Sequence, residues 1–409
     1  MEVLYPRCAG LDVHQQTVVA CARVASGSTV QQDVRTFGTA TADLLALADW
    51  LAAHGCTHVA MESTGVYWKP IWHVLDGQFE LILANALQIR SVPGRKSDVN
   101  DAMWIADLLA HGLIRGSFVP PAAIHELRDL TRTRKQLVRE VAQHTLRIQK
   151  VLEDANLKLT SVISDVMGMS GRAMIEAIIR GEENAERLAD LSQGRLKASR
   201  SAVIAALQGR VTSHHRFLLR LHLTQIDALE VAVRDVEARL GDALTPFQAA
   251  VDRLLTIPAV GRTVARVIVA EIGFDMSRFP TAGHLVSWAG LCPRLQESAG
   301  KRLSTRTRPG NPWLKTTLVQ VAWVAARTRN TYLRAQFLRL KSRRGPKKAI
   351  LAVAASILTA AYYILKDEVT YHELGADYFE RRDKAHITKR LIRRLEDLGL
   401  SVEVRPAAL

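Results

Sequence analysis

The chain has few cysteines, and their spacing excludes two common roles. Its four cysteines are Cys8, Cys21, Cys56 and Cys292. They form no CxxC pair and have no zinc-like spacing, so neither a disulfide scaffold nor a zinc ribbon is expected. We predict reduced, buried cysteines in an intracellular protein.

The sequence also lacks an apolar run long enough for a clear membrane span. Its longest uncharged stretch covers residues 349–365, which falls short of the roughly 20 residues that a spanning helix needs. The first residues contain no basic segment followed by an apolar one, so we see no targeting signal. A buried helix is the better prediction for residues 349–365, and no membrane partner is expected.

Acidic residues are outnumbered by basic ones. The 55 Lys and Arg exceed the 40 Asp and Glu by 55 − 40 = 15, and the pI is near 10. This excess indicates a polyanionic partner, with nucleic acid as the first candidate and a membrane surface as the second. A merely well-solubilised surface is the remaining alternative. At 409 residues the chain is expected to form two or three domains.

The N-terminal region has acidic residues where β-strands are expected to end. Asp12 lies in an apolar strand, where an unpaired carboxylate is costly, and Glu62 directly follows the strand 57–61. The expected element order is β-β-β-α-β-α-β-α, as in a ribonuclease H-like nuclease fold. In open α/β sheets, functional sites lie at the carboxyl ends of the strands. The alternative for Asp12 is a strand-end residue that stabilises a turn.

Two further carboxylates, Asp98 and Asp101, are three residues apart and share one face if residues 94–109 form a helix. Like charges at that spacing repel, and a divalent metal would compensate them. The alternative is an ordinary acidic helix start. Arg95 and Lys96, just before this pair, are candidate nucleic-acid contacts.

The sequence becomes helical after Pro121. Apolar residues recur every three or four positions from Leu127 to Leu159, and again along a second helix expected at 213–243. Two such helices around a shorter insert predict an antiparallel coiled-coil arm, with a plain helical bundle as the alternative. Leu254–Gly273 then resembles a helix-hairpin-helix, whose turn either contacts a phosphate or only packs two helices.

Ser298 lies in a run that is rich in basic residues and nearly free of acid. A hydroxyl beside small neighbours is open to a bulky electrophile, and nearby guanidinium groups can stabilise a phosphoryl group. A basic loop that only grips phosphate is the alternative, and Ser304 and Thr305 are equally plausible hydroxyls. The candidate nucleic-acid contacts of this run are Lys301, Arg302, Arg306, Arg308 and Lys315.

The last part of the chain is predicted to be helical. Apolar helices are expected at 313–326 and 349–365, separated by a basic surface loop with the sequence LKSRRGPKK. From about residue 374 onward, charges at helical spacing predict an exposed helix that is either solvated or in contact with nucleic acid.

Taken together, these stretches resemble the IS110 family of insertion-sequence transposases, also called DEDD transposases. The resemblance rests on GLDVH, MESTGVYW, NALQIRSVPGRKSDVNDAMWIADLL, IPAVGRTVARVIVAEIG, WAGLCP, SAGK and PGNPWLK, in this order. It covers residues up to about 155 and from about 250 to 340. It implies an α/β RuvC-like domain in which four carboxylates bind Mg²⁺: Asp12, Glu62, Asp98 and Asp101.

The resemblance also implies a catalytic serine, and Ser298 is the matching position. Here Ala299 separates it from Gly300 and Glu297 replaces a common preceding serine, so the local sequence departs from the family pattern. The implied activity is DNA recombination through a phosphoserine, guided by a noncoding bridge RNA that pairs with donor and target DNA. Homodimers or homotetramers in the cytoplasm of a bacterial-type cell, associated with the nucleoid, are implied as well.

From this reading we expect four segments. They are a RuvC-like domain at 1–121, a helical coiled-coil arm at 122–247, a mainly helical transposase domain at 248–370 and a basic helical tail at 371–409. Two other functions stay open. One is a metal-dependent nuclease of the Holliday-junction type without serine chemistry, and the other is a non-enzymatic nucleic-acid-binding protein.

Overall fold

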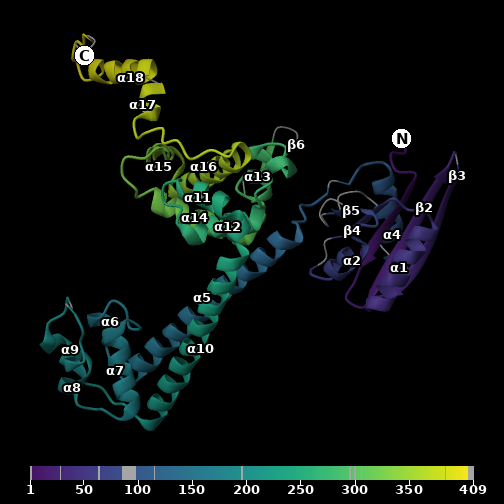
Figure 1. Cartoon of the computed structure of the whole chain (residues 1–409). Helices are drawn as coiled ribbons and strands as arrows, with labels where there is room; N and C mark the ends of the chain where they lie inside the picture. Colours follow the sequence, from purple (N-terminus) through teal and green to yellow (C-terminus); the bar gives the residue numbers. More distant parts are fainter. Residues whose placement is uncertain are drawn as a thin grey trace. The chain divides into compact units, whose positions relative to one another are not determined.

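A computed structural model gives the fold of the chain as two compact units, residues 1–119 and residues 120–409. The first unit is a mixed α/β domain and the second is mostly helical (Figure 1). The structure describes residues 2–27, 29–62, 65–84, 98–114, 116–194, 197–293, 296–298, 301–304, 306–382 and 384–403.

A five-stranded sheet forms the centre of the first unit. Its strands lie in the order β3-β2-β1-β4-β5, with β2 antiparallel to both β1 and β3, and with β4 parallel to β1 and β5. The central strand β1 is buried along almost its whole length, which fits its apolar sequence. The strands are β1 (Arg7–Val13), β2 (Thr17–Ser26), β3 (Thr29–Gly38), β4 (His58–Glu62) and β5 (Glu80–Ala84).

Helices cover both faces of this sheet. Helices α1 (Thr41–Ala53) and α2 (Trp68–Leu75) pack on one face, together with Leu11 and Met61. Helix α4 (Asp98–Ala110) packs on the opposite face, against Cys8, Ala60 and Cys21. The element order expected from the sequence, β-β-β-α-β-α-β-α, is confirmed for the described residues.

Gly10 allows α4 to lie directly on strand β1. A Cβ atom at position 10 would come within 2.3 Å of the carbonyl oxygen of Ala102 and 2.4 Å of the amide nitrogen of Ala106. No side chain fits in that space, so glycine sets the close approach of helix and strand.

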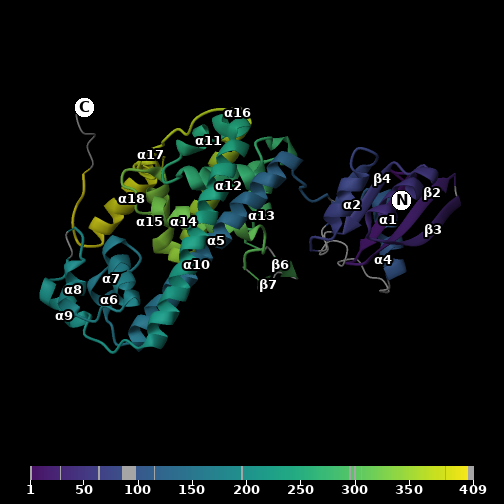
Figure 2. The same ribbon diagram turned by 60° about the horizontal axis from the view of Figure 1, so that its bottom comes forward.

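Two long antiparallel helices dominate the second unit. Helices α5 (Ala122–Asp154) and α10 (Ser213–Ala243) lie side by side along their length (Figures 1 and 2). Arg134 pairs with Glu237 near one end of this arm, and Asp154 pairs with His215 near the other. The second helix matches its expected bounds, whereas the first ends at Asp154, before Leu159.

Four short helices pack at the far end of the arm. They share one apolar core with the ends of α5 and α10, built around Leu152, Ile178 and Leu219. These helices are α6 (Leu159–Val162), α7 (Met169–Arg180), α8 (Ala185–Asp190) and α9 (Arg200–Ala206).

The C-terminal part of the second unit is built around α16 (Pro346–Asp367). This helix is long and apolar enough to cross a membrane by length and composition, yet 56% of its apolar window is buried inside the domain. The buried helix expected from the sequence is therefore confirmed. Around it lie η1 (Thr245–Phe247), α11 (Gln248–Leu255), α12 (Arg262–Ile272), η2 (Met276–Arg278), α13 (Ala282–Trp288), β6 (Gln296–Ser298), β7 (Lys301–Ser304), α14 (Pro312–Ala325) and α15 (Tyr332–Arg344).

One prediction for this region is wrong. The basic segment LKSRRGPKK is not a loop, because its first half ends α15 and its second half begins α16, with only Gly345 between them. Gly345 has φ = +78°, which an L-residue rarely adopts, so glycine permits this abrupt turn. Beyond α16, the expected exposed helical tail is confirmed as α17 (Tyr378–Arg382) and α18 (Lys384–Glu396).

Candidate metal-binding and serine sites

Asp12 is an acidic residue in the most buried strand of the sheet. Its exposed fraction is only 7%, and its Oδ2 atom lies 3.1 Å from Nε2 of His14. Residues two apart on an extended chain point to the same side, which explains this contact. The sequence interpretation placed His14 in a turn and missed it as a partner of Asp12. The two-residue spacing was the available signal.

Glu62 ends the strand beside Asp12. The parallel register pairs Gly10 with Ala60 and Leu11 with Met61, so its continuation sets Asp12 next to Glu62 on strands about 4.8 Å apart. Side chains alternate between faces, and Ala60 faces α4 while Leu11 and Met61 face α1 and α2. Asp12 and Glu62 therefore belong to the face that α4 covers.

The first turn of α4 reaches the same end of the sheet. Cys8 lies against the carbonyl oxygen of Ala106, at 3.6 Å, and Gly10 lies against Ala102, so α4 runs antiparallel to β1. The four residues from Ala102 back to Asp98 span about 6 Å of helix. The two residues from Gly10 to Asp12 span about 6.6 Å of strand. The start of α4 thus lies level with Asp12.

The structure accordingly brings the positions of Asp12, Glu62 and Asp98 to one edge of the sheet. It places Asp101 one turn further along α4. Asp101 is half-buried, and the side chain of Asp98 lies outside the description. Among the described side chains, no group of three Asp, Glu, His or Cys residues is close enough to hold a metal ion. The oxygen donors available here, carboxylates on a buried strand end, fit the ligand preference of Mg²⁺.

The candidate serine lies on a small hairpin of the second unit. Strands β6 and β7 pair antiparallel, and the register sets Ser298 directly opposite Lys301. Residues 299 and 300, which join the strands, and the side chains of Ser298 and Arg302 lie outside the described set. The alternative hydroxyl Ser304 accepts a hydrogen bond from the amide of Arg306 at 3.3 Å, which gives it a turn-stabilising role.

A crossing of two loops holds the base of this hairpin. A Cβ on Gly310 would lie 2.4 Å from the amide nitrogen of Gly290, and both glycines have positive φ, +57° and +73°. Lys315 donates from Nζ to Oγ1 of Thr307 at 2.9 Å and to the carbonyl of Arg308 at 3.1 Å. The loop segments around Gly290 and at 307–310 are thus fixed by tight packing and by a lysine.

The predicted nucleic-acid contacts fall into three groups. Lys301, Arg306 and Arg308 are exposed at or near the hairpin. Lys315 holds the adjacent loop, and burial lowers its pKa. Arg95 and Lys96 lie outside the described residues, as does Thr305.

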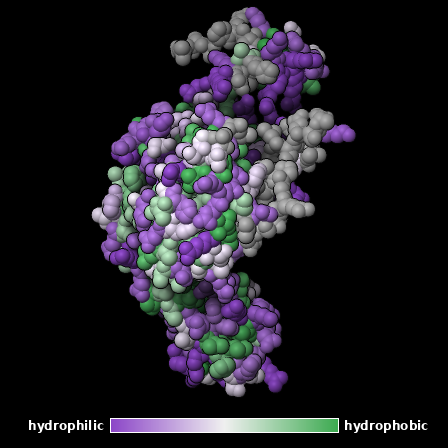
Figure 3. Space-filling model, turned by 90° about the vertical axis from the view of Figure 1, so that its right-hand side faces the viewer, coloured by the Kyte–Doolittle hydropathy of each residue, from purple (hydrophilic) through white to green (hydrophobic). Residues whose placement is uncertain are grey.

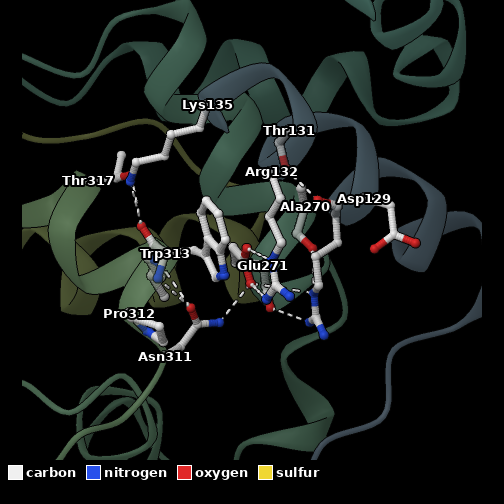
Figure 4. A network of polar contacts seen from close by, with 12 residues as sticks. Asp129, Thr131, Arg132, Lys135, Ala270, Glu271, Asn311, Pro312, Trp313 and Thr317 are labelled. Atoms are coloured by element: carbon white, nitrogen blue, oxygen red, sulfur yellow. Dashed lines mark hydrogen bonds and ion pairs between the residues drawn. The ribbon is translucent and has the colours of Figure 1, made fainter. Parts of the chain in front are cut away.

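Sequence reasoning missed a buried ionic network at the base of the arm (Figure 4). Glu271 of α12 is completely buried, and its two oxygens accept hydrogen bonds from Nε and Nη2 of Arg132, both at 2.8 Å. Asn311 donates to the same carboxylate at 2.6 Å, and Arg128 lies 3.4 Å from it. The network therefore joins three elements: α5, α12 and the start of α14.

Trp313 extends this network with its indole face. The cations of Arg132, Lys135 and Arg139 lie 5.5–5.7 Å from its ring centre. Lys135 also donates to Thr316 at 2.7 Å, and burial lowers its pKa. The arm is thus fixed to the helices that carry the serine hairpin. The signal in the sequence was a lone Glu directly after the apolar stretch 267–270, the same kind of signal that singled out Asp12.

The two helices and the turn predicted at 254–273, from the resemblance to a helix-hairpin-helix, are present as α11, a short turn and α12. Its turn contains Ala259 with φ = +70°, a conformation that alanine rarely adopts, and Gly261 begins α12. A cavity of about 300 Å³ adjoins this turn and includes Thr263, Arg266 and Arg139. Contact with phosphate at this turn stays a prediction.

Comparison with known proteins shows that two segments of the chain are similar to transposases. Residues 9–157 match the family model for DEDD transposases of the IS110 type, and residues 251–338 match the model described as transposase IS116/IS110/IS902 family. The chain belongs to the IS110 family of transposases.

A curated relative is known from Streptomyces coelicolor. It is described as the insertion element IS110 uncharacterized 43.6 kDa protein, and it is 29% identical over 153 residues. The match covers 36% of this chain and 36% of that protein.

Proposed function

We propose that this protein is a DNA recombinase that moves an insertion sequence, with Mg²⁺ held by Asp12, Glu62, Asp98 and Asp101. The observation that carries the proposal is the meeting of Asp12, Glu62 and the first turn of α4 at one edge of the sheet. We further propose that the strand order 3-2-1-4-5 is that of a RuvC-like, ribonuclease H-like domain and that α5 and α10 form a coiled-coil arm.

In this proposal the chain's own groups divide the work. The hydroxyl of Ser298 attacks a DNA phosphorus, the bond from phosphorus to one strand oxygen breaks, and that strand leaves as an alcohol after gaining a proton. A second strand hydroxyl then displaces the serine, so the phosphodiester is re-formed without a nucleotide cofactor. Bound Mg²⁺ would neutralise charge on the phosphate oxygens. Lys301, Arg306 and Arg308 contribute further positive charge.

We also propose that a noncoding bridge RNA supplies sequence choice, so that the protein itself grips backbones. The surplus of 15 positive charges suits two nucleic-acid partners. A homodimer or homotetramer in the cytoplasm, close to the nucleoid, completes the proposal. The nucleic-acid partners are suggested by the family and by charge, and the oligomer by the family alone.

The test traps the covalent intermediate. Purified protein is incubated with DNA carrying the element ends, the guide RNA and Mg²⁺, and protein–DNA adducts that resist denaturant are scored on a gel. We expect Ser298→Ala to abolish adduct and recombination, and Ser304→Ala to retain both. Cleavage that persists in Ser298→Ala without an adduct would instead support the metal-dependent nuclease of the Holliday-junction type.

A second pair of variants tests the carboxylates. Asp12→Asn removes a buried charge at the proposed site, whereas Asp49→Asn removes an exposed charge on α1 of the same domain. We expect Asp12→Asn alone to abolish recombination. If recombination survives Asp12→Asn and Asp101→Asn but is lost with basic-residue substitutions, a non-enzymatic nucleic-acid-binding protein is the better description.

A further inference from the structure

A groove lies between α15 and the tail helices α17 and α18, largely outside the segments that match the two transposase models. Its volume is about 1070 Å³. One wall comes from residues 329–343 and the other from residues 376–380 and 384–391. Helices α17 and α18 expose mainly hydrophilic residues (Figure 3).

The groove is strongly basic. Among the described lining residues, the charged ones are one acid, Glu380, and six bases: Arg329, Arg334, Arg339, Arg343, Lys384 and Arg390. Among the described residues, five of these bases form no ion pair: Arg329, Arg334, Arg343, Lys384 and Arg390. Cations that face one another across a cavity repel, so the groove is stabilised when an anion enters it.

Aromatic contacts hold the two walls together. Phe379 of α17 stacks on Tyr332 of α15, with ring centres 5.1 Å apart, and the Arg339 guanidinium lies 4.8 Å above the Phe379 ring. The amide of Tyr332 also donates to Glu373 at 2.7 Å. These contacts fix α17 against α15, so the groove is a built feature of the second unit.

We propose that this groove binds the phosphodiester backbone of a single nucleic-acid strand. Cations line both walls, as required to neutralise a strand that passes between them. Leu338 and Leu391, which are 50% and 51% exposed, add apolar surface on which bases can rest. A free phosphate or nucleotide would use only part of six cations, whereas a strand presents one charge per nucleotide.

This inference shares with the proposed function the premise that nucleic acid is the partner, but it assigns a different site. Binding to the groove needs neither carboxylates nor metal. It is therefore measured in EDTA, where its failure would leave the Ser298 adduct test untouched. Conversely, the substitution Asp12→Asn is expected to abolish recombination and to leave nucleic-acid binding in the groove unchanged.

The experiment compares two double variants of the full chain with equal change in net charge. Arg343→Ala with Arg390→Ala removes one cation from each wall of the groove. Arg234→Ala with Arg239→Ala removes two exposed cations of α10 that have no ion pair among the described residues. Fluorescence anisotropy measures binding of a labelled oligo-dT, an oligo-U and a duplex of the same length over a salt series.

We expect the groove variant to bind a single strand at least about tenfold more weakly, with the slope of log K against log salt reduced by about 1.4, or about 0.7 per lost phosphate contact. This result with either the DNA or the RNA strand supports the proposal, and the better ligand identifies the strand. An equal loss in the α10 variant, an unchanged salt slope, or an equal loss for the duplex would overturn it.

Discussion

The buried carboxylate of Glu271 offers the sharpest test of how the arm is attached. Glu271 is fully buried, whereas its partners Arg128 and Arg132 have side chains that are 11% and 30% exposed. The substitution Glu271→Gln keeps the shape but removes the negative charge. Two guanidinium groups then face a neutral amide, one of them already with a pKa lowered by burial.

The expected cost follows from this burial. Removing one partner of a buried ion pair destabilises a protein by about 3–5 kcal/mol, because the remaining charge is left without compensation. Glu237 provides the matched control, since it pairs with Arg134 at 2.6 Å in the same arm but is 43% exposed. An exposed pair contributes only about 0–1 kcal/mol. We therefore expect Glu271→Gln to be several-fold more destabilising than Glu237→Gln.

Urea unfolding of the two variants and the parent chain measures this difference. Unfolding is followed by tryptophan fluorescence, to which Trp313 contributes from inside the network. Hydrogen exchange then locates the loss, which we expect in α5, α12 and α14. If Glu271→Gln costs less than about 1 kcal/mol, or no more than Glu237→Gln, the network does not hold the arm and the reasoning fails.

Three further predictions follow from other parts of the chain. Gly10→Ala should lower the stability of the first unit by about 1–3 kcal/mol or more, because the added Cβ collides with the backbone of α4. Gly241→Ala, on an open helix surface, should instead raise stability by about 0.5–1 kcal/mol. Thermal unfolding distinguishes the two variants. Burial, with nearby positive charge from His144, lowers the pKa of His222 below its ordinary 6.5. The folded arm therefore binds fewer protons than the unfolded chain and loses stability as pH falls below that value. His222→Gln should flatten this pH dependence of the melting temperature between pH 7.5 and 5. Cys292 is partly exposed and should react with a thiol reagent at pH 8 before the buried thiols do. Burial raises the pKa values of those thiols to about 11–12. Equal reaction rates for all four cysteines would contradict this packing. The buried thiols are Cys8, Cys21 and Cys56.

Local patterns predicted most of the elements, because each element satisfies its own periodicity. The apolar strands β1 and β2, the second long helix at 213–243 and the buried helix in 349–365 all appear where the sequence indicates them. Helix α15 was missed because its residues 332–344 are rich in Arg and Lys and have only Leu333 and Phe337 buried. With so narrow an apolar stripe, tertiary contacts rather than pattern decide that it is a helix.

The approach of α4 to the sheet could not be predicted from the sequence, although its consequence for the site is large. The sequence shows that Asp98 and Asp101 share a helix, but not that this helix runs antiparallel to β1. The close approach of this helix depends on Gly10, whose missing side chain lets the backbone of Ala102 come into contact. A glycine in a strand indicates close approach of something, and only the structure identifies the partner.

Asp12 and Glu271 show why a buried carboxylate alone does not define a site. Each interrupts an apolar element, and burial of either charge is costly unless a partner compensates it. Glu271 receives two guanidinium groups and an amide from α5 and the α14 start, so its charge is satisfied within the fold. Asp12 contacts His14 at 3.1 Å, a contact that is ionic only when His14 is protonated, and it lies next to the position of a second acid, Glu62. Acids placed together at a strand edge raise the energy of the metal-free domain, whereas an acid placed among arginines lowers it. The sign of the neighbouring charges, which arrive from segments 50 to 140 residues away, therefore separates a candidate cation site from a structural ion pair. It follows that adding Mg²⁺ should raise the melting temperature of the first unit in the parent chain and not in Asp12→Asn, while Glu271→Gln should leave this metal response unchanged.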